Sequence, residues 1–188
     1  GRRGVRANGR DPRELPLIRR AMQLWPGLHE RLGVEPLFER TGHIQLIERP
    51  RDLAEAEARV LLQTAHGIES RLLSAGEVRE LEPEVCDAVT AGLWCPGDGV
   101  ADHTATTRAY AAAATRAGAV IAEGVAARRI VVEGGRAVAV ETAGGRRLPV
   151  EGSLLVLANA GTAALLAEHL ALPLWNLAFQ VLLSKPLA

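Results

Sequence analysis

The first ten residues, GRRGVRANGR, concentrate side chains that bind anions. They contain four arginines and three glycines. A guanidinium presents two parallel N–H donors to a carboxylate or phosphate, and glycine lets the backbone pass close to a planar or anionic ligand. The same composition is typical of a solvated loop. The residues alone leave both interpretations open.

A second candidate lies at residues 154–161, LLVLANAG. The apolar run predicts a strand covered on both faces of a parallel sheet, and small residues, a glycine and a helix-like run follow it. A glycine at that edge lets a ligand approach the backbone, and the next helix N-terminus favours negative charge. Small residues and glycine also occur at β–α junctions that bind nothing, so the signal is generic.

Cysteine and histidine form no catalytic or metal-binding pattern. Cys86 and Cys95 are nine residues apart without a CxxC motif, so we expect two reduced, buried or half-buried thiols. The histidines are spread over the chain, at His29, His43, His66, His103 and His169. None has neighbours that complete a catalytic or metal set, and no GxSxG, HExxH, Walker or EF-hand motif is present. No metal site is expected.

Composition and charge indicate an ordinary globular protein. Of the 188 residues, 48% are hydrophobic and 23% are charged. Lys+Arg and Asp+Glu both number 22, and this balance disfavours binding to nucleic acid or an anionic membrane. No apolar run approaches the roughly 18 residues of a membrane span, and no signal peptide is recognised. We expect a cytoplasmic protein without a transmembrane segment, and we interpret both abrupt ends as those of an internal fragment.

Periodicity and capping residues predict the elements. Residues 1–10 are expected to form a loop. Helices are expected from Asp11 to a break at Pro26 with a further turn up to Gly33, over 51–66, after a capping box at Ser74–Glu77, over 102–118 and over 162–170. Strands are expected in two pieces around Gly42 within 37–48, over 71–74, 91–96, 119–125 and 153–158, in a meander with turns at Gly134 and Gly144, and within 174–185. This order predicts a mixed α/β (α+β) fold with a mainly parallel sheet and a small antiparallel insertion.

Taken together, the segments resemble the amine-oxidising flavoproteins of the D-amino-acid oxidase superfamily, most closely the branch of sarcosine oxidase, glycine oxidase and hydrogen cyanide synthase subunits. The matching pieces, in the family's order, are GVRANGRDPRELPLIRRAMQLW, ERTGHIQLI, SAGEVRELEPEV, PGDGVADHTATTRAYAAAATRAGAVIAEGVAARRIVV, VETAGGRRLPVEGSLLVLANAG and LPLW with QVLLSKPL. The resemblance implies an incomplete FAD-binding, Rossmann-like domain with a β-meander, at 1–33 and 96–172. It also implies part of an antiparallel-sheet substrate domain, at 34–95 and 173–188.

The resemblance also implies roles for individual residues. Arg3, Gly4, Val5 and Arg6 would line the flavin, and Arg6 falls near the position where relatives hold the substrate carboxylate. Val125 would meet the adenine side of FAD through its backbone. The residues that would approach FAD from the sheet edge are Ala158, Asn159, Ala160 and Gly161. The sequence departs from the family in lacking the GxGxxG fingerprint and in having Thr162-Ala163 where many relatives carry Trp.

The function implied is FAD-dependent oxidation of the C–N bond of a small amino acid or N-alkyl amino acid, resembling sarcosine or glycine, by hydride transfer to the flavin. Partner subunits of a hetero-oligomeric dehydrogenase are a further expectation. Two alternatives stay open: a flavoenzyme acting on a polyol phosphate or 2-hydroxy acid, and a non-catalytic remnant of such a gene.

Overall fold

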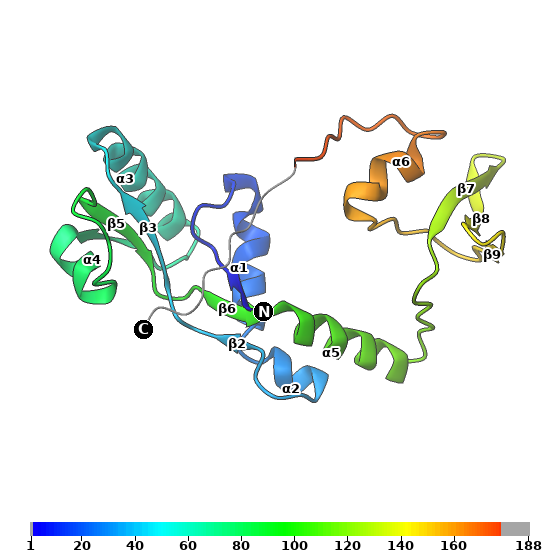
Figure 1. The fold of residues 1–188 in the computed structure, drawn as a ribbon, viewed down its shortest axis with the longest axis horizontal. Helices are drawn as coiled ribbons and strands as arrows, with labels where there is room; N and C mark the ends of the chain where they lie inside the picture. Colours follow the sequence, from blue (N-terminus) through cyan, green and yellow to red (C-terminus); the bar gives the residue numbers. More distant parts are fainter. Residues whose placement is uncertain (1, 178–188) are drawn as a thin grey trace. The chain divides into compact units, whose positions relative to one another are not determined.

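The computed structural model describes residues 2–177, in two compact units that are described separately (Figure 1). The units are Gly1–Ile121 and Ala122–Ala188. The fold is mixed α/β, as expected from the sequence, and its sheets are small and antiparallel. The predicted assignment of ranges to a FAD-binding and a substrate domain stays a prediction.

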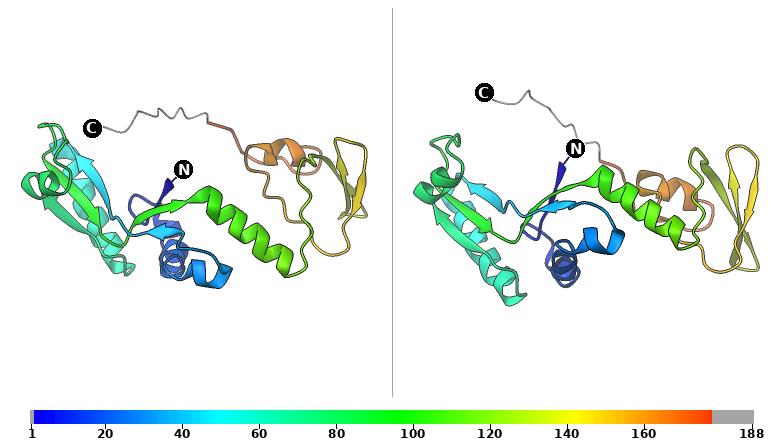
Figure 2. Two further views of the ribbon diagram at one scale, coloured as in Figure 1. Left: turned by 60° about the horizontal axis from the view of Figure 1, so that its bottom comes forward. Right: turned by 90° about the horizontal axis from the view of Figure 1, so that it is seen from below.

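One sheet of the first unit has a helix on each face (Figure 2). Its elements are β3 (His43–Ile47), β5 (Ala91–Cys95) and β4 (Arg71–Ser74), in this spatial order, with α3 (Pro50–Ala65) and α4 (Ala75–Leu81). Leu93 and Cys95 of β5 pack with Ala56 of α3, while Trp94 packs with the α4 side around Val78. This division follows from the alternation of side chains along a strand.

The other sheet of the first unit carries the arginine-rich N-terminal segment. Its spatial order is β1-β6-β2, with β1 at Arg2–Val5, β6 at Gly99–Asp102 and β2 at Phe38–Glu39. The helices beside it are η1 (Pro12–Glu14), α1 (Leu15–Leu24), α2 (Leu28–Leu32) and α5 (His103–Arg116). Leu28 and Leu32 pack against Ala109 of α5, and Leu15 packs with Ala7 just after β1.

Local capping signals correctly predict where helices begin and end. Asp102 accepts the Ala105 amide and caps α5, and Gly118 follows that helix with φ +94. The capping box at Ser74 and Glu77 is present at the start of α4. Gly42 separates β2 from β3, as predicted, with φ +76, and a Cβ there would overlap the ring of Trp94.

The second unit contains the predicted meander. Its strands β7 (Ala127–Glu133), β8 (Arg136–Thr142) and β9 (Arg147–Pro149) pair in sequence order, with the first turn at Gly134-Gly135. Two short helical pieces follow, η2 (Asn159–Gly161) and α6 (Thr162–Leu166). The last predicted strand begins in irregular backbone at residues 174–177, and its remainder lies outside the described residues.

Several predictions of strands were wrong. Every strand pair among the described residues is antiparallel, so the expected parallel sheet is not observed there. Residues 119–125 and 153–158 form no strand, and Leu155 and Leu157 are 77% and 82% exposed. An apolar run becomes a strand only where a neighbouring backbone pairs with it, and no described strand pairs with these two segments.

Other corrections concern the first residues, a helix end and a thiol. The expected loop at residues 1–10 starts with strand β1, because its backbone pairs with β6, a strand that was also missed. The predicted helix over 162–170 stops at Leu166 and continues as a turn. Cys86 is exposed rather than half-buried, although both cysteines are free.

Candidate functional site

Strand β1 presents arginine and glycine on an edge of its sheet. In the antiparallel register with β6, Arg3 lies opposite Ala101 and Gly4 lies opposite Val100. No described strand pairs with the other edge of β1. Arg3 and Gly4 are exposed, and no other atom lies within 4 Å of the position that a Cβ at Gly4 would take. The strand therefore offers open space and unpaired backbone groups beside an arginine.

Arg6 lies just beyond β1, in a turn tied at both ends. Its side chain is exposed, and its carbonyl accepts a hydrogen bond from Arg10 Nε at 3.2 Å. The carbonyl of Arg10 in turn accepts from Arg59 Nη1 of α3, also at 3.2 Å. Gly9 supplies the left-handed conformation of this turn, with φ +70. An exposed guanidinium is thus carried on a fixed backbone.

Asp98 is the buried residue that holds this turn. It lies between β5 and β6, and only 1% of its surface is exposed. Its Oδ1 accepts the Ala7 amide at 2.7 Å, and its Oδ2 accepts the Asn8 amide at 3.0 Å. Its own carbonyl accepts the amide of Gly42 at 2.8 Å. One residue thereby joins the turn after β1 to the segment that enters β3.

The side chain of Asn8 extends this buried network toward the sheet of β3, β5 and β4. Its Nδ2 donates to the carbonyl of Leu93 at 3.3 Å and to His43 Nδ1 at 3.1 Å. Its Oδ1 accepts from Gln63 Nε2 at 3.2 Å, and Gln63 Oε1 lies 3.5 Å from the Sγ of Cys95, which donates to it. Because an amide nitrogen only donates, His43 Nδ1 must accept, so the ring is neutral with its proton on Nε2.

Burial sets the protonation tendencies in this network. Desolvation dominates and raises the pKa of Asp98, although hydrogen bonds from the Ala7 and Asn8 amides and the positive charge of Arg6 oppose that shift. Burial and then the charge of Arg6 lower the pKa of His43, against the opposing effect of Asp98. Burial, followed by the charge of Asp98, raises the pKa of the Cys95 thiol to about 12. Cys95 is therefore an un-ionised thiol near neutral pH.

Sequence reasoning missed this network, and only Gln63 gave a signal. Gln63 is a polar residue on the apolar face of α3, where a buried side chain needs hydrogen-bond partners. Asp98, between two glycines in the segment PGDGV, has the composition of an ordinary turn. The partners of the Asp98 and Gln63 side chains lie 32 to 91 residues away in the sequence, which no periodicity reveals.

The remaining predicted flavin residues belong to the second unit. Val125 lies in irregular backbone before β7 and is 37% exposed. The exposed residues Ala158–Gly161 form the turn around η2, where Gly161 N donates to the carbonyl of Ala158 at 2.9 Å. Asn159 has φ +49, the one left-handed conformation at a described non-glycine residue. The contacts with FAD predicted for Val125 and for Ala158–Gly161 stay predictions.

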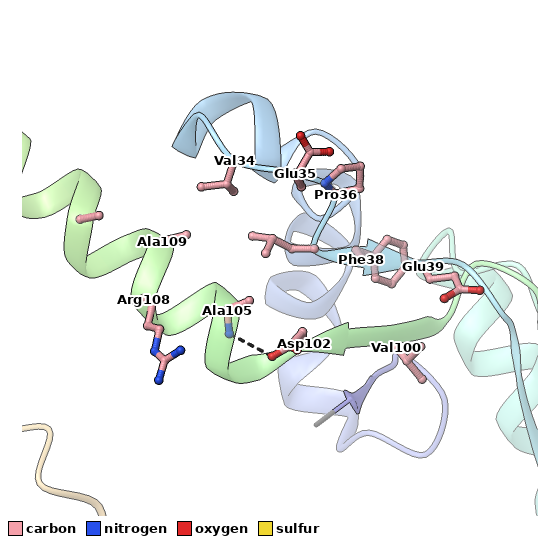
Figure 3. Close-up of a pocket in the computed structure, with 12 residues that line it drawn as sticks. Val34, Glu35, Pro36, Phe38, Glu39, Val100, Asp102, Ala105, Arg108 and Ala109 are labelled. Atoms are coloured by element: carbon pink, nitrogen blue, oxygen red, sulfur yellow. Dashed lines mark hydrogen bonds between the residues drawn. The ribbon is translucent and has the colours of Figure 1, made fainter. Parts of the chain in front are cut away.

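One large pocket of the first unit contains none of the predicted site residues. It has a volume of about 820 Å³ and lies between α5, β2, β6 and the segment after α2 (Figure 3). Its walls are mostly apolar, with the carboxylates of Glu35, Glu39 and Asp102 and the guanidinium of Arg108. Asp102 is also the cap of α5, and the Ala105 amide lowers the pKa of its carboxyl.

The described residues contain neither a cluster of metal ligands nor a membrane-spanning helix. No group of three or more His, Cys, Asp or Glu side chains there could hold a metal ion. No helix in that part of the chain has the length and apolar character needed to cross a membrane.

Comparison with known proteins identifies the family. A family model described as FAD dependent oxidoreductase matches residues 2–187. The chain belongs to this FAD-dependent oxidoreductase family. The predicted family is confirmed, and the narrower assignment to the sarcosine oxidase and glycine oxidase branch stays a prediction.

Individual relatives agree with the family. Human mitochondrial dimethylglycine dehydrogenase is 30% identical over 102 residues, which cover 54% of this chain and 12% of that protein. L-proline dehydrogenase from P. horikoshii has a TM-score of 0.78 and 24% identity, covering 86% of this chain and 42% of that one. Glycine oxidase from Geobacillus kaustophilus has a TM-score of 0.75 and 24% identity, covering 87% of this chain and 45% of that one. The chain thus spans less than half the length of these relatives.

The residues of β1 fit a planar, anionic cofactor such as FAD. Space beside Gly4 is open, and the outer edge of the strand is unpaired among the described residues. Arg3 within the strand and Arg6 just after it supply cationic donors. A flat ring needs the close backbone approach that glycine permits, and guanidinium groups complement negative charge. No described side chain obstructs this face of Gly4.

Proposed function

We propose that this chain is part of a FAD-dependent oxidoreductase that oxidises the C–N bond of a small amino acid or N-alkyl amino acid. When bound, FAD supplies the two-electron acceptor for that oxidation. The chain's own residues would bind the cofactor and orient the substrate. Arg3, Gly4 and Val5 would lie along the ring system, and Arg6 would hold the substrate carboxylate.

The observation that carries this proposal is the placement of Arg6. Its exposed guanidinium stands directly after the glycine-containing strand β1, on a turn whose next two amides are held by buried Asp98. A guanidinium on fixed backbone loses little freedom when it forms a bidentate pair with a carboxylate. The names of the relatives, dimethylglycine dehydrogenase and glycine oxidase, support a small amino-acid substrate.

Residues of the second unit are further candidates for contact with FAD. We propose that Val125 and the turn Ala158–Gly161 approach FAD through their backbone. The exposure of this turn and the left-handed conformation of Asn159 support this role, because sparsely populated backbone conformations of non-glycine residues occur often at ligand sites. The pyrophosphate-binding GxGxxG fingerprint would come from sequence outside this chain. Sequencing the coding DNA upstream of Gly1 tests this. An in-frame stop codon there would contradict the proposed catalytic activity.

The direct test uses the product of the open reading frame that contains this chain, purified with FAD. Arg6→Ala is expected to raise KM for carboxylate-bearing amines about tenfold or more, since a charged hydrogen-bonded pair contributes about 1.5–3 kcal/mol. Arg20→Ala, an exposed arginine of α1, is the matched control and should leave KM unchanged. An unchanged KM in Arg6→Ala would remove Arg6 from substrate binding.

A substrate panel separates the alternatives. Glycine, sarcosine and dimethylglycine test the proposed class, while a polyol phosphate and a 2-hydroxy acid test the other class of flavoenzyme. Turnover of only the phosphate or hydroxy acid would contradict C–N oxidation. Copurification of the tagged protein would also show whether partner subunits are present, as expected for a hetero-oligomeric dehydrogenase.

A further inference from the structure

Asp98 holds the backbone of the turn that immediately follows Arg6. Its two carboxylate oxygens each accept one backbone amide, from the consecutive residues Ala7 and Asn8. Both amides immediately follow Arg6 in the chain. Fixing two successive amides fixes the direction in which the preceding residue leaves the turn, because few backbone dihedrals remain free between them.

The chemistry of the contact requires a carboxylate. Two N–H donors converge on one side chain, and an ionised carboxylate is an acceptor at both oxygens. An amide in the same place would accept one N–H and point its own NH₂ group at the other. A buried donor left without an acceptor is unfavourable by an amount similar to that of a lost hydrogen bond. The isosteric change from Asp to Asn is therefore a sharp probe of this contact.

The side chain of Asn8 is the second group that holds the turn in place. The side chain of Asn8 is fully buried, and its amide nitrogen and oxygen are bound by Leu93, His43 and Gln63. The turn is consequently held on its backbone by Asp98 and on its side chain by α3, β3 and β5. Arg6 itself stays exposed, so the buried contacts define its position without covering it.

Building on the proposed function, we propose that Asp98 is a positioning residue for Arg6. Through the amides of Ala7 and Asn8, it would hold the guanidinium of Arg6 where a small carboxylate binds. Loss of the carboxylate at Asp98 should release the turn and weaken carboxylate binding while leaving the exposed face of Arg6 chemically intact.

The first measurement needs neither flavin nor activity. In the product of the complete open reading frame, trypsin cleavage after Arg6 is followed by mass spectrometry for the wild type and Asp98→Asn. Cleavage requires a mobile backbone, so the variant should be cut about tenfold faster. Asp87→Asn is the control, because Asp87 is fully exposed and the substitution is the same. Equal cleavage rates in wild type and Asp98→Asn would overturn the proposal.

The second measurement asks whether the released turn matters for the site. Acetate is titrated against the flavin absorbance of the FAD-loaded protein, with neutral acetamide as the matched probe. The Kd of acetate should rise about tenfold in Asp98→Asn and stay unchanged in Asp87→Asn. Faster cleavage with an unchanged acetate Kd would show a purely structural residue and would also overturn the proposal.

The outcomes keep the two proposals distinguishable. A wild-type protein that holds no FAD would contradict the proposed function, and the cleavage rates would then decide alone whether Asp98 holds the turn. If Asp98→Asn does not fold, as judged by circular dichroism, Asp98→Ser replaces it. A serine hydroxyl accepts one of the two amides without a repulsive donor, and the same faster cleavage and weaker acetate binding are expected.

Discussion

Gly99→Ala should separate two strands of the sheet that carries the arginine segment. Gly99 opens β6, where it pairs with Val5 of β1, and it also faces β2. A Cβ there would lie 2.8 Å from Phe38 Cε2, 2.9 Å from the Cα of Arg40 and closer still to the backbone oxygen of Glu39. Two of these neighbours are backbone atoms, which cannot rotate away as a side chain does.

The magnitude follows from the overlap and the pairing that it disrupts. Inserting a methyl group into a packed site costs about 1–3 kcal/mol, and losing a β2–β6 hydrogen bond adds about 1 kcal/mol. We therefore expect Gly99→Ala to lower the free energy of unfolding by about 3 kcal/mol. Urea denaturation followed by far-UV circular dichroism measures this loss.

The control lies two residues away. Gly97 also has no positive φ, and nothing lies within 4 Å of a Cβ built on it. Gly97→Ala should change the free energy of unfolding by less than about 0.5 kcal/mol. Equal losses in the two variants, or a loss below about 1 kcal/mol in Gly99→Ala, would refute the overlap argument, since the reasoning depends on the difference between the two sites.

Two further predictions concern the core and a helix cap. Leu93→Ala should lower the free energy of unfolding by about 2–5 kcal/mol, because Leu93 is 0% exposed. Leu17→Ala is the control and should change this free energy little, because Leu17 is 76% exposed. Similar losses in the two variants would contradict the prediction. The Ser74 amide, then the Arg71 guanidinium and the Ser74 hydroxyl, lower the pKa of Glu77 from 4.5 to about 2. Its stabilisation is therefore present above pH 4.5 and lost as the pH falls toward 2. The difference in urea midpoint between wild type and Glu77→Gln should shrink over that range, and a constant difference would contradict the assignment.

Elements with local signals were predictable from the sequence. The capping box of Ser74 and Glu77, the left-handed Gly33 after α2 and the turn at Gly134-Gly135 all lie within a few residues of the element that they define. Such signals depend on hydrogen bonds between near neighbours, so their residue types are sufficient. Helices α3 and α5 were correct for the same reason.

Elements that depend on distant pairing were not predictable. Strand β1 looks like a loop because it lacks alternating apolar residues and contains Gly4, yet β6 supplies its backbone partner from about a hundred residues away. Residues 153–158 show the reverse case. Their apolar run has the composition of a buried strand, but no described strand pairs with it. Composition indicates only the strand propensity of a segment, whereas pairing with a neighbouring strand decides whether a strand forms.

The same limit applies to the candidate site. Arg6 could be selected only through the resemblance to the flavoprotein family, because its residue type and neighbours alone fit a solvated loop equally well. Asp98 and Asn8 could not, because an aspartate between glycines and an asparagine before a glycine are ordinary turn residues. Only the fold brings the three residues together, with an acceptor facing two amides that lie 90 and 91 residues earlier.

The buried network around Asp98 is better explained by geometry than by stability. Placing a carboxylate, two amides and an imidazole in a protein interior requires desolvating all of them, and well-packed apolar side chains often stabilise a core as well or better. Apolar packing, however, tolerates small shifts. Asp98 accepts two backbone amides, and Asn8 is hydrogen-bonded through both the nitrogen and the oxygen of its side chain. Such directional hydrogen bonds permit one arrangement of the turn. A turn that must hold Arg6 at a fixed place relative to a small ligand benefits from that restriction. The network therefore supports a binding role for the turn, because a solvated loop would have no need of it.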